Sequence, residues 1–257
     1  MSGFAAFVAF AAAIASGSNP IQRWAFATGG AVDSSPVLSN DGAVLYAFSD
    51  DGNLYSVNAS TGAGRWSFPT GGGSGAGKQG YNPVLSLDDM IVYIKNDHLL
   101  YAVNTFDGTQ LWGIPLGGFN GGSPALSSDG STIFAGGCLG GNCSYLFAFD
   151  ALTGSKVWGT AVASGLLSPA VGSDGNVVYA GSSHNNALYA LQSSDGAKLW
   201  SVAGGMSSPA VSTDGTTVYV GSWDWSLRAL STTNGSTLWA GRNQYLLGFT
   251  RESAREH

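Results

Sequence analysis

The chain has 257 residues, and 16 acidic against 10 basic residues give it a net charge of −6. Charged residues make up only 10% of it, 39 residues are glycine and 44% are hydrophobic, a composition that excludes an intrinsically disordered chain. No cluster of Lys and Arg could neutralise a run of phosphates, so we expect no nucleic-acid partner. Two cysteines are too few for a disulfide-dense scaffold, so aromatic and β-branched residues must supply the core.

The N-terminal segment is the first element along the chain. Residues 4–15 form an apolar run of 12 residues, which is too short to span a bilayer. The run ends in Ala13-Ile14-Ala15, a small-x-small cleavage pattern, and residues 1–15 therefore predict a secretory signal peptide. The protein would then be secreted, periplasmic or lumenal, without a transmembrane span. The alternative is an uncleaved or buried segment, because no Lys or Arg precedes the run.

An internal repeat organises residues 21–241. Six tryptophans mark it at intervals of 39 to 46 residues: Trp24, Trp66, Trp112, Trp158, Trp200 and Trp239. In each of the five intervals a proline is followed five residues later by aspartate and ten residues later by Tyr or Phe. Four short segments per unit are rich in Val, Leu, Tyr and Phe, and Asp-Gly or Thr-Gly turns separate them. This pattern predicts an all-β protein, a β-propeller of four-stranded antiparallel blades with five repeats; the alternative is a twisted solenoid.

Each unit ends in an eleven-residue string, which we call the docking string: residues 56–66, 102–112, 148–158, 190–200 and 229–239. A glycine always lies four residues before the final tryptophan, where a tight turn can demand a positive φ. The string opens with a small residue, Ser or Ala, and we expect this residue to leave room for the indole of a neighbouring blade. The tryptophans predicted to pack between blades are Trp66, Trp112, Trp158, Trp200 and Trp239.

The docking string resembles the tryptophan-docking motif of the quinoprotein alcohol dehydrogenase-like propellers, the PQQ-like repeat family. Five copies in fixed register over residues 24–239 carry this resemblance. WD40 repeats have a similar period, but their Gly-His and Trp-Asp signature is absent from the corresponding positions. The resemblance implies a propeller fold, and it leaves the activity open because the family includes both quinone-dependent enzymes and non-catalytic scaffolds.

Enzymes of that family hold pyrroloquinoline quinone (PQQ) with an aspartate base, a calcium bound partly by glutamate, an arginine and a disulfide between adjacent cysteines. Here no glutamate precedes Glu252, and four residues separate Cys138 from Cys143. None of the family's site residues can be carried over, so we predict no catalytic residue, no cofactor and no metal site. The prediction is a non-catalytic scaffold that binds a protein or carbohydrate ligand. The alternatives are a fragment or divergent member of the PQQ- and calcium-dependent dehydrogenases, and a surface module without a specific ligand.

Loop lengths distinguish the two rims of the predicted propeller. The spacing from proline to aromatic and from glycine to tryptophan is constant. The distance from the aromatic to the docking string varies from 9 to 14 residues, and that from tryptophan to the next proline varies from 9 to 17. In an up-and-down meander both variable connections lie at one rim, which we call the variable rim. The residues predicted to contact a ligand there are Lys78, Tyr81, Phe119, Trp223 and Trp225.

Further predictions concern the cysteines and the two ends. In a secreted chain we expect Cys138 and Cys143 to form a disulfide, with free thiols or a metal site as alternatives. Trp24 heads an outer strand with no strands before it to complete a blade, which predicts an open arc or a strained five-blade ring. Residues 242–257 contain both glutamates and predict a tail, which is either disordered, a cloning remnant or an imperfect gene end.

Overall fold

The computed structural model describes residues 6–8, 22–71, 81–118, 122–139 and 141–242. These residues form β-strands and connecting turns, with no helix among them. Twenty of the strands form five four-stranded antiparallel sheets, and each sheet is a meander in which every strand pairs with the next along the chain. The predicted all-β architecture of five four-stranded units is confirmed.

The sheets are numbered in chain order. Sheet 1 contains β3 (Val37–Leu38), β4 (Val44–Phe48), β5 (Asn53–Asn58) and β6 (Gly64–Pro69); sheet 2 contains β7 (Val84–Leu85), β8 (Ile91–Lys95), β9 (Leu99–Asn104) and β10 (Gln110–Pro115). Sheet 3 contains β11 (Ala125–Leu126), β12 (Thr132–Leu139), β13 (Asn142–Asp150) and β14 (Lys156–Ala161). Sheet 4 contains β15 (Ala170–Val171), β16 (Val177–Ser182), β17 (Ala187–Gln192) and β18 (Lys198–Ala203), and sheet 5 contains β19 (Ala210–Val211), β20 (Thr217–Gly221), β21 (Ser226–Ser231) and β22 (Thr237–Arg242).

The turn between the first and second strands of each sheet is closed by the repeated aspartate. In sheet 1 Asp41 Oδ1 accepts hydrogen bonds from Ser39 Oγ at 2.6 Å and from the Ala43 amide at 2.9 Å. Because these bonds stabilise the charged carboxylate, the pKa of this aspartate lies below its usual value. Hydrogen bonds within the turn also lower the pKa of the four counterparts, Asp88, Asp129, Asp174 and Asp214.

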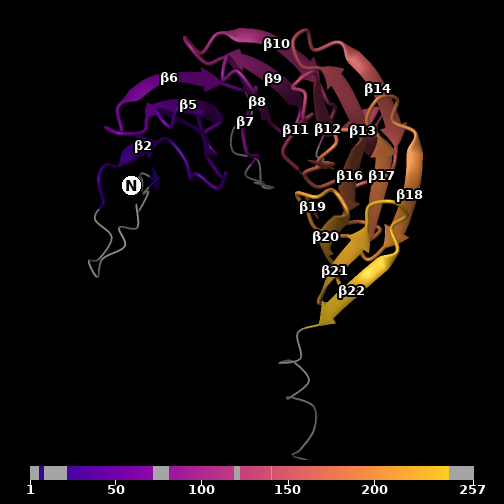
Figure 1. Ribbon diagram of the computed structural model, residues 1–257. Coiled ribbons are helices and arrows are strands. Elements are labelled where there is room, and N and C mark those ends of the chain that lie inside the picture. Colours follow the sequence, from indigo (N-terminus) through magenta and orange to yellow (C-terminus); the bar gives the residue numbers. More distant parts are fainter. Residues whose placement is uncertain (1–5, 9–21, 72–80, 119–121, 140, 243–257) are drawn as a thin grey trace, which may run out of the picture.

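The five sheets stand side by side along an arc (Figure 1). The short first strands β7, β11, β15 and β19 contact one another in sequence on the concave side. The last strands β6, β10, β14, β18 and β22 run along the convex side. In this view sheets 1 and 5 lie at opposite ends of the arc and do not adjoin.

A two-stranded piece precedes sheet 1. The strand that follows Trp24, β2 (Phe26–Thr28), pairs with β1 (Ala6–Val8) and not with a strand of sheet 5. Phe26 packs edge-on against Tyr55 of sheet 1 at 5.5 Å between ring centroids. Residues 1–5 and 9–21 lie outside the described residues, as do residues 243–257 of the tail expected over 242–257, so the signal peptide and the tail stay predictions. Arg242 is the last residue of β22.

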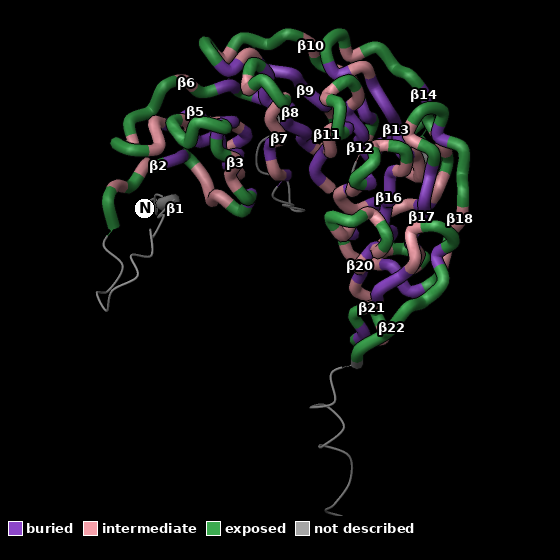
Figure 2. Tube along the Cα trace, in the orientation of Figure 1, coloured by how far each residue is buried: buried purple, intermediate pink, exposed green. Residues whose placement is uncertain are grey.

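The hydrophobic core is divided among the interfaces between successive sheets. One cluster of buried side chains lies between each neighbouring pair, from sheets 1 and 2 to sheets 4 and 5. Central strands are therefore buried on both faces, and all five residues of β8 are buried. The outer strands alternate between exposed and partly buried residues, as in β10. Figure 2 shows the buried residues along the inner strands and the exposed ones along the convex edge.

Candidate functional site

Five of the repeated tryptophans pack on the sheet that follows: Trp24, Trp66, Trp112, Trp158 and Trp200. Trp66 Nε1 donates a hydrogen bond to the carbonyl oxygen of Thr105 at 2.9 Å, and its ring lies over Gly108. A Cβ at Gly108 would lie 2.8 Å from the indole, and its φ is +76°, so both the contact and the backbone require glycine. The same contacts recur along the arc: Trp24 with Ala59 and Gly62, Trp112 with Ala151 and Gly154, Trp158 with Ser193 and Gly196, and Trp200 with Thr232 and Gly235.

Two predictions for the docking strings are wrong: the role of the small residue that opens the string, and the packing of Trp239 between blades. The small residue that opens the string lies opposite the tryptophan of its own sheet, as Ala148 does opposite Trp158. The glycine, and not this small residue, therefore accommodates the indole of the neighbouring sheet. Burial is also uneven, because Trp158 is 8% exposed whereas Trp239 is 48% exposed. No sheet follows Trp239 within the described residues, which explains its exposure.

The loops that connect the strands lie at two opposite rims, and backbone hydrogen bonds join neighbouring loops at each rim. The variable rim comprises the loops between β4 and β5 and between β6 and β7, with their counterparts in the other sheets. There the Thr70 amide donates to the Gly52 carbonyl at 2.8 Å, which joins the two kinds of variable loop. The fixed rim comprises the turns between β3 and β4 and between β5 and β6, with their counterparts, and there the Ala59 amide donates to the Ala43 carbonyl at 2.9 Å.

The residues predicted to contact a ligand on the variable rim have different positions. Lys78 and Phe119 lie outside the described residues. The prediction for Tyr81 is wrong, because this side chain is only 5% exposed and belongs to the core between sheets 1 and 2. Its hydroxyl donates to Asp97 Oδ1 at 2.7 Å, and burial together with this carboxylate raises the pKa of Tyr81. A ring enclosed in this way cannot stack on a ligand.

Lys95, the last residue of β8, was not among the residues predicted from the sequence. Its side chain is fully buried, and Nζ lies 4.6 Å from the centroid of the Tyr81 ring in a cation–π arrangement. Burial lowers the pKa of Lys95 to about 8. The sequence feature that could have indicated a buried lysine is its position at the end of the apolar run IVYIK. Because the ammonium group is enclosed, it supports the packing under the variable rim and does not face solvent.

Trp223 and Trp225 are exposed on the variable rim, at 62% and 77% of their surface. Their turn joins β20 to β21 and is held from within, because Arg228 Nη2 forms an ion pair with Asp224 Oδ2 at 2.6 Å. Arg228 Nη1 also donates to the Ala203 carbonyl at 3.0 Å, which connects the turn to sheet 4. Trp225 has a φ of +64°, in the left-handed region that an aromatic residue rarely adopts. The turn thus presents two indoles to solvent on an anchored backbone.

The longest hairpin of the variable rim lies between β12 and β13 in sheet 3. Cys138 in this hairpin is disulfide-bonded. The side chain of Cys143, its predicted partner, lies outside the described residues. The pairing of the two cysteines therefore stays a prediction.

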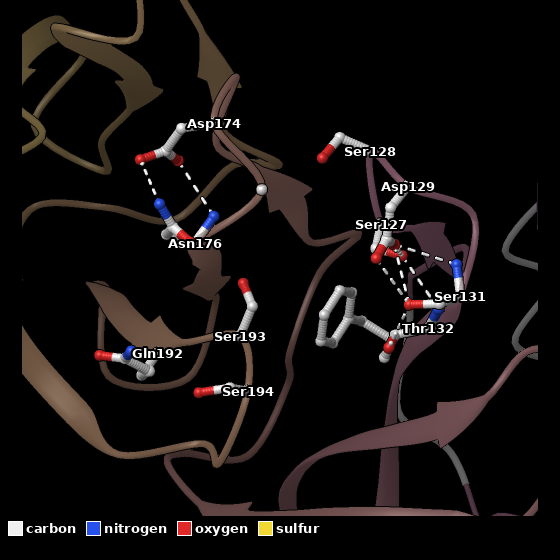
Figure 3. A pocket seen from close by; sticks show the side chains of 12 residues that line it. Ser127, Ser128, Asp129, Ser131, Thr132, Asp174, Asn176, Gln192, Ser193 and Ser194 are labelled. Carbon is white, nitrogen blue, oxygen red and sulfur yellow. Dashed lines mark hydrogen bonds between the residues drawn. The ribbon is translucent and has the colours of Figure 1, made fainter.

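The fixed rim contains grooves between neighbouring sheets. The groove between sheets 3 and 4 has a volume of about 330 Å³ and is rich in hydroxyl groups. Figure 3 shows Asp129 and Asp174 on opposite sides of it, each bonded within its own turn, to Ser131 and to Asn176 respectively. The Ser193 hydroxyl lines the same groove and is buried without a hydrogen-bond partner.

The groove between sheets 1 and 2 is equivalent in position but differs in chemistry. It has a volume of about 470 Å³, and its lining includes Arg65, Asp89, Met90 and Phe106. Asp89 Oδ2 accepts a hydrogen bond from the Asn40 amide at 2.6 Å, whereas Asp89 Oδ1 is buried without a partner. This groove was not predicted from the sequence, although Asp89 occupies a turn position that is glycine in the other four units.

The described residues contain no group of three His, Cys, Asp or Glu side chains placed to hold a metal ion. No helix long and apolar enough to cross a membrane occurs in the described ranges. The functional groups exposed on the described surface include aromatic rings, hydroxyl groups and a few charged side chains, all carried by the stacked sheets.

The arrangement of the sheets is matched by known proteins. The family model described as outer membrane protein assembly factor BamB matches residues 13–143 and 142–255. The chain belongs to this family. Among solved structures, BamB from Moraxella catarrhalis superimposes with a TM-score of 0.64 at 20% identity, over 86% of this chain and 64% of that one. This BamB-family chain thus spans less than two thirds of the length of that BamB.

The fold extends beyond the BamB family. The C-terminal WD40 domain of Sif2 matches with a TM-score of 0.66 at 15% identity, over 82% of this chain and 57% of that one. At such identities both matches establish the propeller fold alone. Among curated proteins no match was found.

Proposed function

We propose that this chain is a secreted or periplasmic, non-catalytic scaffold that binds a partner protein through its variable rim. The observation that carries the proposal is the turn with Trp223 and Trp225. It exposes two large aromatic rings on a backbone held by the Asp224–Arg228 ion pair. Tryptophan dominates the binding energy of many protein interfaces, and a preorganised loop loses little entropy on binding.

Membership of the BamB family supports the choice of a protein partner. The family is named for a factor in outer membrane protein assembly, and a BamB-like propeller suggests a protein-interaction scaffold in general. We propose that the partner is a component or client of an assembly process at an outer membrane. The same family name is the basis for proposing a periplasmic or outer-membrane location. A carbohydrate ligand on the same two indoles is the competing outcome.

The non-catalytic part of the proposal relies on the residues present. The PQQ enzymes that the docking string resembles require a glutamate ligand to calcium, and this chain has none before Glu252. Mixing the chain with PQQ and Ca²⁺ should therefore leave the absorbance spectrum of the quinone unchanged. A spectral shift accompanied by alcohol oxidation would contradict this part and favour a divergent dehydrogenase.

The binding part can be tested with the double variant Trp223→Ser/Trp225→Ser. A partner would first be captured from the periplasmic extract of the host with a photo-crosslinker at position 225 and identified by mass spectrometry. Its affinity for the purified variants would then be measured. We expect the double variant to bind at least about tenfold more weakly, with an unchanged melting temperature. Leu152→Ser, on the fixed rim and likewise exposed, is the matched control and should bind like the wild type. Equal binding by the double variant would overturn the proposal.

A further inference from the structure

The groove between sheets 1 and 2 departs from the internal repeat at several positions, and these positions converge on one surface. In the other four units the position of Asp89 is glycine: Gly42, Gly130, Gly175 and Gly215. The position of Phe106 is Ser, Leu, Ser or Thr, and that of Arg65 is Leu or Val. Met90 replaces Ala, Ser, Asn or Thr. All four departures line the same groove.

The departure at Asp89 has a conformational cost. Its φ is +59°, and the four equivalent glycines have φ between +69° and +75°. An L-amino acid is strained there, although Asp tolerates this region better than most residues. Strain of this kind concentrates at functional sites, so the observed outlier directs attention to the groove. The hydrogen bond from the Asn40 amide to Asp89 Oδ2 accounts for one of the two carboxylate oxygens.

The second carboxylate oxygen of Asp89, Oδ1, has no hydrogen-bond donor among the described residues of the groove. Oδ1 is buried and accepts no hydrogen bond. An ionised carboxylate can only accept, and leaving a charged oxygen desolvated and unpaired is unfavourable. Arg65 lines the same groove but forms no ion pair with Asp89 among the described residues. A positive charge from a ligand, held against this carboxylate, would compensate for the unpaired oxygen.

The remaining lining residues indicate the rest of the ligand. Phe106 is 80% exposed and Met90 is 58% exposed, so an apolar wall stands beside the carboxylate. The Arg65 guanidinium is exposed and supplies donors suited to carbonyl or carboxylate oxygens. Carboxylate, apolar wall and guanidinium together complement a basic side chain, an apolar side chain and a peptide carbonyl.

We propose that this groove on the fixed rim binds an extended peptide segment of a partner protein. A Lys or Arg of the peptide pairs with Asp89, and an adjacent apolar side chain packs on Phe106 and Met90. Arg65 donates to a carbonyl oxygen of the peptide. The site is separate from the Trp223–Trp225 turn on the variable rim, so the two surfaces can be tested independently.

The experiment uses the full chain and an array of nine-residue peptides. Each peptide has a central Lys or Arg next to Leu or Phe, and its matched partner has Gln in place of the basic residue. We expect binding of the basic peptides only, and a loss of at least about tenfold in Asp89→Asn, because Asn tolerates the same φ but lacks the charge. Asp195→Asn, which removes an exposed carboxylate from the docking string of sheet 4, is the charge-matched control and should bind like the wild type.

A second pair of variants tests the apolar wall. Phe106→Ser should weaken peptide binding about tenfold, whereas Leu152→Ser, at the same string position in sheet 3, should not. Trp223→Ser/Trp225→Ser should leave peptide binding intact even if the proposed variable-rim function fails.

Three results would overturn the proposal: equal binding of the Gln peptides, full binding by Asp89→Asn, or binding of a neutral glycan array with no peptide bound. Asp89→Gly provides a check on folding, since it restores the residue of the other units. We expect it to lose peptide binding while its melting temperature is not lowered.

Discussion

Trp158 and Trp239 occupy the same position in two copies of one docking string, yet their environments differ. Each ring packs on the aromatic residue of its own sheet at a similar distance, 5.9 Å for Phe134 with Trp158 and 6.1 Å for Tyr219 with Trp239. Trp158 also donates a hydrogen bond to the Ser193 carbonyl at 2.8 Å and is 8% exposed. Trp239 has no following sheet in the described part of the chain and is 48% exposed.

This difference shows how stability is distributed along the arc. Each docking tryptophan that is followed by another sheet contacts an aromatic residue of its own sheet on one side and the turn of the next sheet on the other, as Trp158 does with Phe134 and Ser193. Such an array gains stability from nearest-neighbour interfaces, so an interior interface contributes more than the last sheet alone.

Trp158→Ala should lower the free energy of unfolding by about 3–5 kcal/mol, because it empties a buried site between sheets 3 and 4 and removes a hydrogen bond. Trp239→Ala should cost about 1 kcal/mol or less, because half of that ring is already in water. Urea denaturation followed by circular dichroism measures both. Equal losses would contradict the nearest-neighbour explanation.

Gly196→Ala should cost about 2–3 kcal/mol, because its φ is +72° and the new Cβ would lie 2.5 Å from the Trp158 ring. Gly42→Ala is the matched control, with a φ of +69° and no atom within 4 Å of the added carbon. Only the backbone strain of about 1 kcal/mol applies there. If thermal denaturation gave the same loss for both variants, the indole contact would contribute nothing.

Acid should destabilise an interior sheet and the last sheet alike, because the turn aspartates bond within their own hairpins. Hydrogen bonds from Ser127 and Ser131 lower the pKa of Asp129 to about 2, and similar bonds lower that of Asp214. A lowered folded-state pKa gives stability that is present above pH 4 and is lost as the pH falls toward 2. Asp129→Asn and Asp214→Asn should each flatten the fall in melting temperature between pH 4 and pH 2 by a similar amount. A flattening confined to Asp129→Asn would show that this contact also depends on the neighbouring sheet.

The smallest expected effect is a gain in stability. Trp225 has a φ of +64° and is 77% exposed, so Trp225→Gly removes strain and little packing. We expect a stabilisation of about 0.5–1 kcal/mol in thermal denaturation. Trp223→Gly, at a position without a positive φ, is the control and should not stabilise the protein. A destabilised Trp225→Gly variant would indicate that the ring has a packing role.

Local features were predictable because short-range chemistry fixes them. The strands, the Asp-closed turns and the docking glycines depend on hydrogen bonds and φ values within about ten residues, and these signals repeat in every unit. The candidate site was only partly predictable. The exposed indoles of Trp223 and Trp225 stood out as exceptions in their unit, whereas Tyr81 appeared to belong to a surface loop but is buried against Lys95.

The amino-acid sequence by itself determined the repeat, the four-strand unit and the position of each docking tryptophan, since each follows from spacing along the chain. Only the tertiary structure decided which faces meet. It buried Tyr81 and Lys95, left Trp239 half in solvent, and brought Arg65, Asp89 and Phe106 into one groove. Arg65 belongs to sheet 1, and Asp89 and Phe106 belong to sheet 2. The spacing of residues within one unit does not predict how two sheets pack against each other. Burial of apolar surface between whole sheets sets that arrangement.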